Sequence, residues 1–218
     1  MMLKLMAALG SYIYAYTERS LMVNLWIGSR LETEHFTVEQ QGKQLPIDSK
    51  GQPLEVHIRV PLYAENFALS CGGEPLPYRM EQGYAVVAGV WTAETPILLS
   101  YTTAVRYVRA NPLAQETRGQ VAVLHGPVLL CAEGIDNGGR VDFTLPAQPP
   151  QTVTGTGLAD ETVTGMAADG SPVRLIPYYR WCNRFEKPTD AAMAVWFRCE
   201  GMPAEDTFPQ DGRLYDYC

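Results

Sequence analysis

The clearest pattern of hydrophobic and polar positions along the chain is LEVHIRV, residues 54–60. Apolar side chains occupy every second position, and the positions between them hold Glu55, His57 and Arg59. A strand directs successive side chains to opposite faces, so this alternation predicts an antiparallel strand with one buried and one solvent-facing side.

Similar short apolar runs follow one another and are separated by turn signals such as Gly72-Gly73, Asp169-Gly170 and the proline cluster 146–150. Many short strands between frequent glycine and proline turns predict an all-β fold, here two consecutive antiparallel β-sandwich units. The expected strands are 12–16, 21–27, 54–60, 67–71, 84–88, 97–101, 105–108, 121–124, 128–132, 141–145, 162–166, 173–176 and 193–199.

The first residues differ from the rest, because Met1–Leu9 consists of good helix formers and Gly10 stands where a C-terminal cap belongs. This predicted helix has no N-cap and resembles the end of a longer helix. Strand signal then stops for about ten residues near 109–119. We therefore expect a helix over 1–10, a first β-sandwich over 11–110, and a second, complete or incomplete, over 111–218.

The charge and composition of the chain argue against several classes of partner. The net charge is −7 and no cluster of Lys or Arg is present, which argues against nucleic acid and anionic membrane surfaces as partners. No apolar run approaches the roughly 18 residues that cross a bilayer. The apolar start continues into SYIYAY without a signal-peptide cleavage site, so a cytoplasmic location is expected.

The five cysteines suggest free thiols. They are odd in number and no two lie within three residues of each other, which favours a reducing compartment over a disulfide framework or zinc knuckle. They are Cys71, Cys131, Cys182, Cys199 and Cys218.

Residues for catalysis are few. The best carboxylates for glycosidase chemistry are Glu116, Glu133 and Asp136, but a surface pair of Glu116 with Arg118 and a turn opened by Asp136 are the favoured interpretations. Metal-ligand spacing and a nucleophile elbow are absent, so no catalytic and no metal-binding residue is predicted. The histidines are His35, His57, expected on a solvated strand face, and His125, expected to bind a backbone group.

The most aromatic stretch is IPYYRWCNR, residues 176–184. Tyr178, Tyr179 and Trp181 could form a platform for a sugar ring. The favoured alternative is that two of these rings fill the core, as aromatic residues in β proteins usually do.

Several of these motifs together resemble glycoside hydrolase family 127, the β-L-arabinofuranosidase group. The resemblance spans nearly the whole chain and includes the stretches LGSYIYAY, LMVNLWIGS, LEVHIRVP and IPYYRWCNR. The chain departs from the family at Pro61-Leu-Tyr-Ala64, where the family usually has Pro-Gly-Trp-Ala. In the stretch 108–137 the matching residues are Val108, Arg109, Ala110, Asn111, Pro112, Arg118, Gly119, Val121, Ala122, Gly126, Pro127, Cys131, Glu133, Asp136 and Asn137.

The resemblance implies that the chemistry belongs to an α/α barrel preceding these sandwiches. There, zinc is held by cysteines and a glutamate, and one cysteine is the proposed nucleophile. None of the five cysteines here matches the family's Cys-Cys-Pro-Pro-Asn motif. The resemblance thus implies a truncated fragment: the C-terminal sandwiches, with residues 1–10 as the remnant of the last barrel helix and no cofactor of their own.

Three hypotheses follow. The first is a non-catalytic region that docks to a separately encoded barrel or self-associates, through apolar residues of the helix (Leu3, Leu5, Met6, Leu9) and a charged loop with Arg109, Asn111, Glu116 and Arg118. The second is a stand-alone carbohydrate-binding module using the aromatic platform. The third is a hydrolase with its own site, for which no activity is expected. Arabinose-containing glycans are the ligands that the parent family implies.

Overall fold

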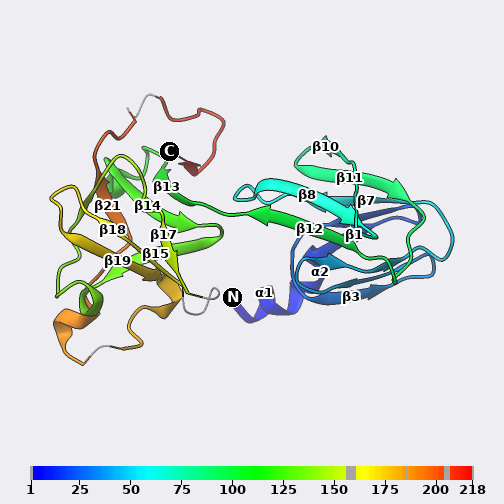
Figure 1. Cartoon of the computed structure of the whole chain (residues 1–218), viewed down its shortest axis with the longest axis horizontal. Helices are drawn as coiled ribbons and strands as arrows, with labels where there is room; N and C mark the ends of the chain where they lie inside the picture. The colour runs from blue at the N-terminus through cyan, green and yellow to red at the C-terminus, as the bar shows by residue number, and fades with distance from the viewer. Residues whose placement is uncertain (1, 156–160, 185, 204–206, 218) are drawn as a thin grey trace. The chain divides into compact units, whose positions relative to one another are not determined.

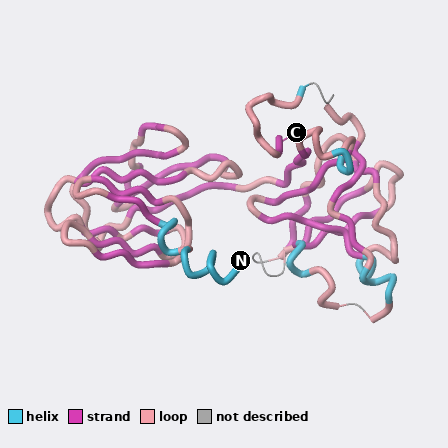
Figure 2. Tube along the Cα trace, turned by 180° about the vertical axis from the view of Figure 1, so that it is seen from behind, coloured by secondary structure: helices cyan, strands magenta, loops and turns pink. Residues whose placement is uncertain are grey.

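The computed structural model describes residues 2–155, 161–184, 186–203 and 207–217. The chain divides into two compact units, Met1–Thr102 and Thr103–Cys218. Strands dominate both units and the helices are short (Figures 1 and 2), which confirms the predicted all-β class. No helix within the described residues is long and apolar enough to span a membrane.

The first unit contains three sheets. A five-stranded sheet has the order β1-β2-β7-β11-β10, a four-stranded sheet the order β5-β12-β8-β9, and a three-stranded sheet the order β3-β4-β6. The strands are β1 (Tyr14–Tyr16), β2 (Ser20–Val23), β3 (Ser29–Glu32), β4 (Thr37–Gln40), β5 (Gln44–Leu45), β6 (Ile47–Asp48), β7 (Leu54–Arg59), β8 (Glu65–Cys71), β9 (Glu74–Pro75), β10 (Arg79–Glu81), β11 (Tyr84–Gly89) and β12 (Ile97–Thr102).

The alternating stretch 54–60 explains how the first core forms. In β7, Leu54, Val56 and Ile58 are buried, whereas the residues between them face outward. They join one core cluster with side chains from the other sheets, including Val38, Leu45 and Ile97. The pairing of β2 with β7 is parallel, an exception to the antiparallel expectation.

The second unit is built on one ten-stranded sheet with branches. Strands β14 and β15 pair with each other only near their turn, up to the pair Val123 and Leu130, and then separate. Segment 193–199 lies beside both strands, because β20 pairs with β15 and β21 pairs with β14. The strands are β13 (Val105–Ala110), β14 (Gln120–His125), β15 (Val128–Glu133), β16 (Thr144–Leu145), β17 (Thr152–Thr154), β18 (Thr162–Met166), β19 (Pro172–Pro177), β20 (Met193–Ala194), β21 (Trp196–Cys199) and β22 (Tyr215–Tyr217).

A second core cluster lies within this unit. Val121, Val123, Leu130, Leu175 and Phe197 are almost completely buried in it. The apolar runs on either side of His125 therefore pack a core, as their composition indicates. Short 3-10 helices carry the remaining turns: η1 (Gln115–Thr117), η2 (Gly134–Asp136), η3 (Tyr178–Arg180) and η4 (Pro188–Ala191).

The start of the chain differs from expectation. Helix α1 (Met2–Ala8) does form, but Gly10 begins a second helical turn, α2 (Gly10–Ile13), instead of capping the first. Gly10 does not adopt the positive φ that a C-terminal glycine cap uses. Strand β1 consequently begins at Tyr14, not at Tyr12.

The division between the units lies earlier than the predicted boundary after Ala110. Strand β13 pairs with β14 and β22, both in the second unit, so its residues belong there. The pause in strand signal at 109–119 is a loop within the second unit.

Candidate functional site

A buried ion cluster joins two separated motifs of the second unit. Glu133, at the end of β15, is completely buried, and its carboxylate accepts hydrogen bonds from Cys182 N (2.8 Å) and Arg184 Nη2 (2.8 Å). Asp136 in η2 accepts two further bonds from the same guanidinium, 2.5 Å from Nη2 and 3.2 Å from Nη1. Arg184 thus donates to both carboxylates and offsets part of the cost of burying their charges.

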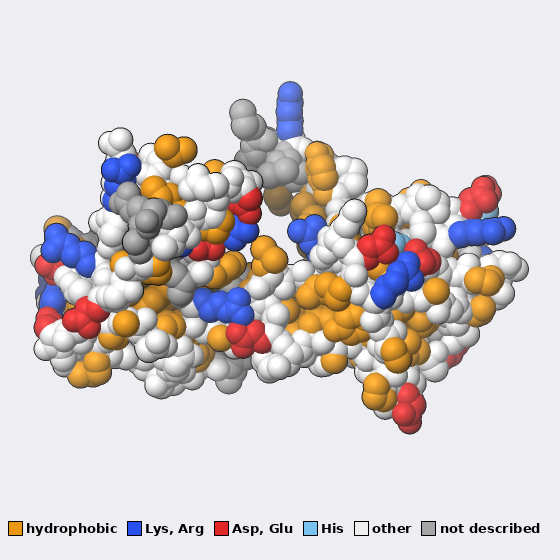
Figure 3. Space-filling view, turned by 90° about the horizontal axis from the view of Figure 1, so that it is seen from above, with side chains coloured by type: hydrophobic (Ala, Val, Ile, Leu, Met, Phe, Trp, Pro, Cys, Tyr) orange, Lys and Arg blue, Asp and Glu red, His pale blue; other side chains and the backbone are white. Residues whose placement is uncertain are grey.

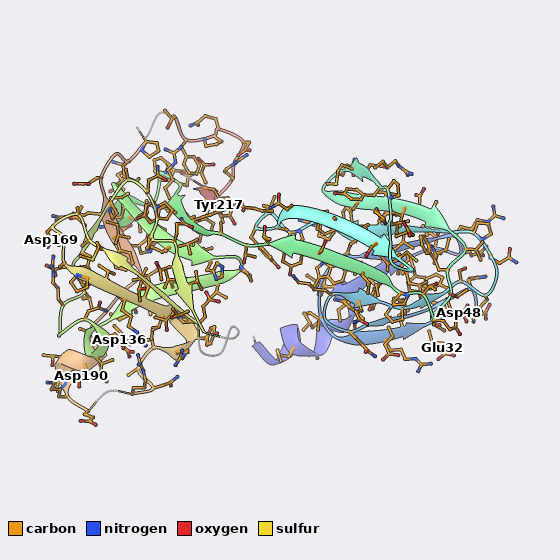
Figure 4. The ribbon with its side chains drawn as sticks, viewed as in Figure 1. Glu32, Asp48, Asp136, Asp169, Asp190 and Tyr217 are labelled. Atoms are coloured by element: carbon orange, nitrogen blue, oxygen red, sulfur yellow. The ribbon has the colours of Figure 1, made fainter. Side chains whose placement is uncertain are left out.

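The two carboxylates therefore share one cationic partner. A glycosidase needs one carboxyl group that gives up a proton and another that attacks or activates water. Here both carboxylates accept hydrogen bonds from the same arginine, so they are not arranged as a separate acid and nucleophile. Figure 4 labels Asp136 near Asp190 of η4, at one end of the second unit.

The thiol of Cys131 adjoins this cluster. Burial, together with the nearby charges of Glu133 and Asp136, raises the pKa of this thiol to about 12. A nucleophilic or metal-binding cysteine requires the thiolate, so a pKa raised this far holds Cys131 in the unreactive form.

The aromatic stretch lies next to the cluster, at the surface. Tyr178, Tyr179 and Trp181 are 43%, 57% and 36% exposed, so the rings do not fill the core. Tyr178 stacks on Trp181 with ring centroids 6.3 Å apart and an interplanar angle of 19°. The indole Nε1 donates to Ala191 O at 3.0 Å, which fixes the orientation of Trp181. Together these three residues are called the aromatic corner below.

Arg109, one of the four residues of the predicted docking loop, is committed to the interior. It is 6% exposed, and its guanidinium donates to Asp216 Oδ2 (2.9 Å) and to the hydroxyl and carbonyl oxygens of Thr207 (both 3.1 Å). The guanidinium also lies 5.3 Å from the ring centre of Phe208. Arg109 therefore ties the end of the chain to β13.

The other loop residues lie at the surface. Asn111 donates to Arg213 O (3.1 Å), Arg118 donates to Pro112 O (2.9 Å), and Glu116 is exposed in η1. Beside them is a groove of about 550 Å³, lined in part by Leu113, which is 87% exposed, and by Trp196, Leu214 and Tyr215.

His125 has two side-chain partners in place of the expected backbone group. Its Nδ1 lies 2.6 Å from Glu161 Oε1, and its Nε2 lies 3.0 Å from Thr103 Oγ1. No pattern in the sequence indicated that His125 would contact Thr103 and Glu161, because only the folded sheet brings these residues together. His57 lies on the polar side of β7, with Nε2 2.7 Å from Glu55 Oε1, and His35 is exposed in a turn.

The cysteines of the described residues are free: Cys131 is buried, and Cys71, Cys182 and Cys199 are half-buried. Cys218 lies outside the described residues. Within those residues no group of three His, Cys, Asp or Glu side chains could hold a metal ion.

Residues 105–198, from the start of β13 into β21, match the glycoside hydrolase family 127 C-terminal domain. The resemblance to family 127 is confirmed. The matched region contains the ion cluster, the aromatic corner and the loop that follows β13.

Relatives of known activity match a longer part of the chain. A non-reducing end beta-L-arabinofuranosidase from Bifidobacterium longum subsp. longum is 27% identical over an alignment of 230 positions, which includes 83% of this chain and 34% of that protein. The chain thus spans about a third of the length of this relative.

Solved structures of the same family share the fold. A GH127 beta-L-arabinofuranosidase from Geobacillus stearothermophilus T6 has a TM-score of 0.70 at 23% identity, over 91% of this chain and 36% of that one. A second GH127 beta-arabinofuranosidase also has a TM-score of 0.70, at 24% identity, over 88% of this chain and 37% of that one.

Proposed function

We propose that this chain is the non-catalytic C-terminal β-sandwich region of a family 127-like enzyme, and that it supports or docks to a catalytic barrel in the same or a separate polypeptide. The observation that carries the proposal is the family 127 C-terminal domain match at 105–198. The parent activity would be hydrolysis of β-L-arabinofuranosides, the activity that the name of the Bifidobacterium relative gives.

The chemistry of the described residues supports this proposal. Glu133 and Asp136 both bind Arg184, and Cys131 has a pKa raised to about 12. Two carboxylates held by one guanidinium, and a thiol that keeps its proton at neutral pH, suit a structural role better than the role of acid, base or nucleophile. A cytoplasmic location and the absence of nucleic-acid and membrane partners stay predictions.

Enzyme assay and binding measurement test the docking role. The purified chain should release no arabinose from 4-nitrophenyl β-L-arabinofuranoside, and should bind a family 127 barrel from the same organism in a pull-down assay.

Leu113→Asp should weaken that binding, because it places a charge in the groove beside the loop. Leu62→Asp, at another strongly exposed leucine (80%), is the matched control. Turnover by the chain alone, or no association with the barrel, would contradict the proposal.

Self-association is a further role within the same proposal. The first unit carries exposed apolar side chains among charged ones on the side that Figure 3 shows, and Tyr16 and Met22 on β1 and β2 are among its exposed residues. Apolar surface next to a sheet edge favours pairing between copies. Sedimentation analysis should give a mass that rises with protein concentration, whereas a constant monomer mass would exclude this role.

A carbohydrate-binding module is the second candidate function, favoured by the exposure of the aromatic corner. Titration with arabinose oligosaccharides should change the tryptophan fluorescence of the wild-type chain, and Trp181→Ala should abolish the change. Tyr215→Ala, at an exposed tyrosine of the same unit, should leave it intact. No fluorescence response at millimolar sugar would remove this candidate.

A further inference from the structure

Asn137, in the loop that follows η2, is the one asparagine of the chain that a glycine follows. The other asparagines, Asn24, Asn66, Asn111 and Asn183, precede Leu, Phe, Pro and Arg. Glycine has no side chain, so nothing on Gly138 blocks the approach of its backbone nitrogen to the side-chain amide of Asn137. The sequence Asn137-Gly138 therefore has the chemistry for a spontaneous modification, deamidation, that none of the functions above involves.

The reaction needs only water as a second reactant. The backbone nitrogen of Gly138 attacks Cγ of Asn137, and a C–N bond forms. The bond from Cγ to Nδ2 breaks, and the leaving nitrogen takes the proton of Gly138 N and departs as ammonia. Water then opens the cyclic imide and leaves a carboxylate on residue 137, as aspartate or isoaspartate.

The attacking nitrogen of Gly138 is free. Among the described residues the N–H of Gly138 makes no hydrogen bond, whereas Asn137 N and Gly139 N both donate to Gly134 O, at 3.1 and 2.8 Å. The backbone angle ψ of Asn137 is 25°, which turns Gly138 N away from Cβ of Asn137. Ring closure requires these two atoms on the same side of the bond from Cα to the carbonyl carbon. The loop must therefore rearrange before the reaction can begin.

Three hydrogen bonds hold the amide of Asn137 in this unreactive geometry. Its Nδ2 donates to Glu133 O (2.9 Å) and to Arg174 O (3.0 Å), and its Oδ1 accepts from Arg174 N (2.9 Å). The ladder between β15 and β19 ends at the pair Ala132 and Leu175. The amide thus supplies the next contact between the two strands, and it fixes the loop to β19.

The product of deamidation does not fit the same position. A carboxylate has no N–H, so it cannot donate to the carbonyl oxygens of Glu133 and Arg174 that the amide contacts. Its oxygen would instead face these two oxygens, which lose their partner. Asp136, labelled in Figure 4, immediately precedes Asn137, so the change occurs beside the ion cluster.

We propose that Asn137 is the site at which this chain deamidates, that its amide contacts slow the reaction while the loop lies on β19, and that the acidic product releases the loop. Hydrolysis of the imide does not restore the amide, so the release is permanent. The proposal is independent of docking to a barrel and of sugar binding.

Incubation of the full chain at pH 8, followed by peptide mass spectrometry, measures conversion at each asparagine. The reference is a synthetic peptide of residues 134–142, GIDNGGRVD, which keeps the Asn-Gly sequence but lacks Glu133 and Arg174. Asn137 should convert at least about tenfold more slowly in the folded chain than in the peptide, because three hydrogen bonds must open first. In the urea-unfolded chain Asn137 should be the first asparagine to convert.

Either of two results would overturn this part of the proposal. Equal rates in the peptide and the folded chain would show that the contacts do not protect Asn137. Earlier conversion of another asparagine in the unfolded chain would show that Asn137 is not the preferred site.

Asn137→Asp tests the release of the loop. It should lower the Tm of the second unit by about 4–8 °C, because two hydrogen bonds lose their donor. Hydrogen exchange over residues 134–139 should also become faster. Asn183→Asp, at an exposed asparagine of the same unit, is the matched control and should shift the Tm by less than about 2 °C. Equal Tm and exchange in the two variants would contradict the release.

Discussion

Among the described residues of the second unit, Glu133 is the most deeply buried acidic residue. It is fully buried, and its carboxylate accepts hydrogen bonds from the N–H of Cys182 and the guanidinium of Arg184, which both come from the segment after β19. Cys182 adopts a positive φ of 64°, an unusual conformation for a residue with a Cβ, and this turn brings its N–H to the carboxylate. The ion cluster thus fixes the backbone that carries the aromatic corner.

Removal of the arginine should therefore destabilise the unit. Breaking a buried ion pair by deleting one partner costs about 3–5 kcal/mol, and partial exposure of Arg184 lowers the expected loss for Arg184→Met to about 2 kcal/mol. Chemical denaturation measures this free energy of unfolding. Arg198→Met, at an exposed arginine on β21, should change it by less than about 0.5 kcal/mol. Equal effects of the two substitutions would contradict the structural role of the cluster.

Cys131 gives a prediction about pH. Its pKa is 9.0 without perturbation and about 12 in the folded chain, so between these values the unfolded chain loses the proton and the folded chain keeps it. The contribution of this group to stability is therefore fully present below pH 9 and is lost as the pH rises toward 12. Cys131→Ala should lessen the fall in stability over this range, as measured by denaturation at several pH values.

Alkylation provides the control for that prediction. At pH 8 iodoacetamide should leave Cys131 unmodified in the folded protein and modify it in denaturant, as detected by peptide mass spectrometry. Rapid modification of Cys131 in the folded protein would show that the thiol is not protected.

At the level of elements, the 3-10 helices η2 and η4 contact each other through a position that only glycine can fill. A Cβ added at Gly134 would lie 2.1 Å from the carbonyl oxygen of Thr189, far inside van der Waals contact. Gly134 N also donates to Ala192 O at 2.8 Å. The backbone of η4 thus packs directly on that of η2.

Gly134→Ala should consequently separate the two helices. We expect a loss of about 1–3 kcal/mol, the usual cost of overpacking, and a change in the fluorescence of Trp181, whose indole is bonded to η4. Thermal denaturation and fluorescence measure the two effects. Gly10→Ala is the control, because a Cβ there meets no atom and φ is not positive. If Gly134→Ala is as stable as Gly10→Ala, the close contact does not exist in solution.

The longer elements could be predicted from sequence, and the shortest ones could not. Strands β7, β11, β12, β14 and β15 each coincide with a predicted run, because burial of one face imposes an apolar pattern. Strands β3, β4, β10 and β22 carry Arg, Glu, Gln or Asp and were not predicted. The pairs β3–β4 and β10–β11 are local hairpins that lack a clear apolar pattern, whereas β22 pairs with the distant strand β13.

For the whole molecule, the main feature is that each unit has its own hydrophobic core. The two core clusters share no residue, and the division falls between β12 and β13. Two independent cores imply two independent folding units.

Separate expression of residues 1–102 and 103–218 should therefore yield two folded proteins. Each should unfold cooperatively with a stability of about 5–15 kcal/mol, the usual range for domains of this size. Calorimetry of the full chain should show transitions that match those of the separate halves. A half that is unfolded in isolation would show that the units depend on each other.

The sequence by itself determined the all-β class, most of the longer strands and the resemblance to family 127, because burial of one strand face and the turn geometry impose local patterns. Only the tertiary structure decided that Glu133 and Asp136 pair with Arg184, that Arg109 points inward, and that the amide of Asn137 bonds the backbone of Arg174. Such contacts join residues far apart in the chain. Their partners are set by how the sheet branches and bends, and the local pattern of apolar and polar residues does not encode this.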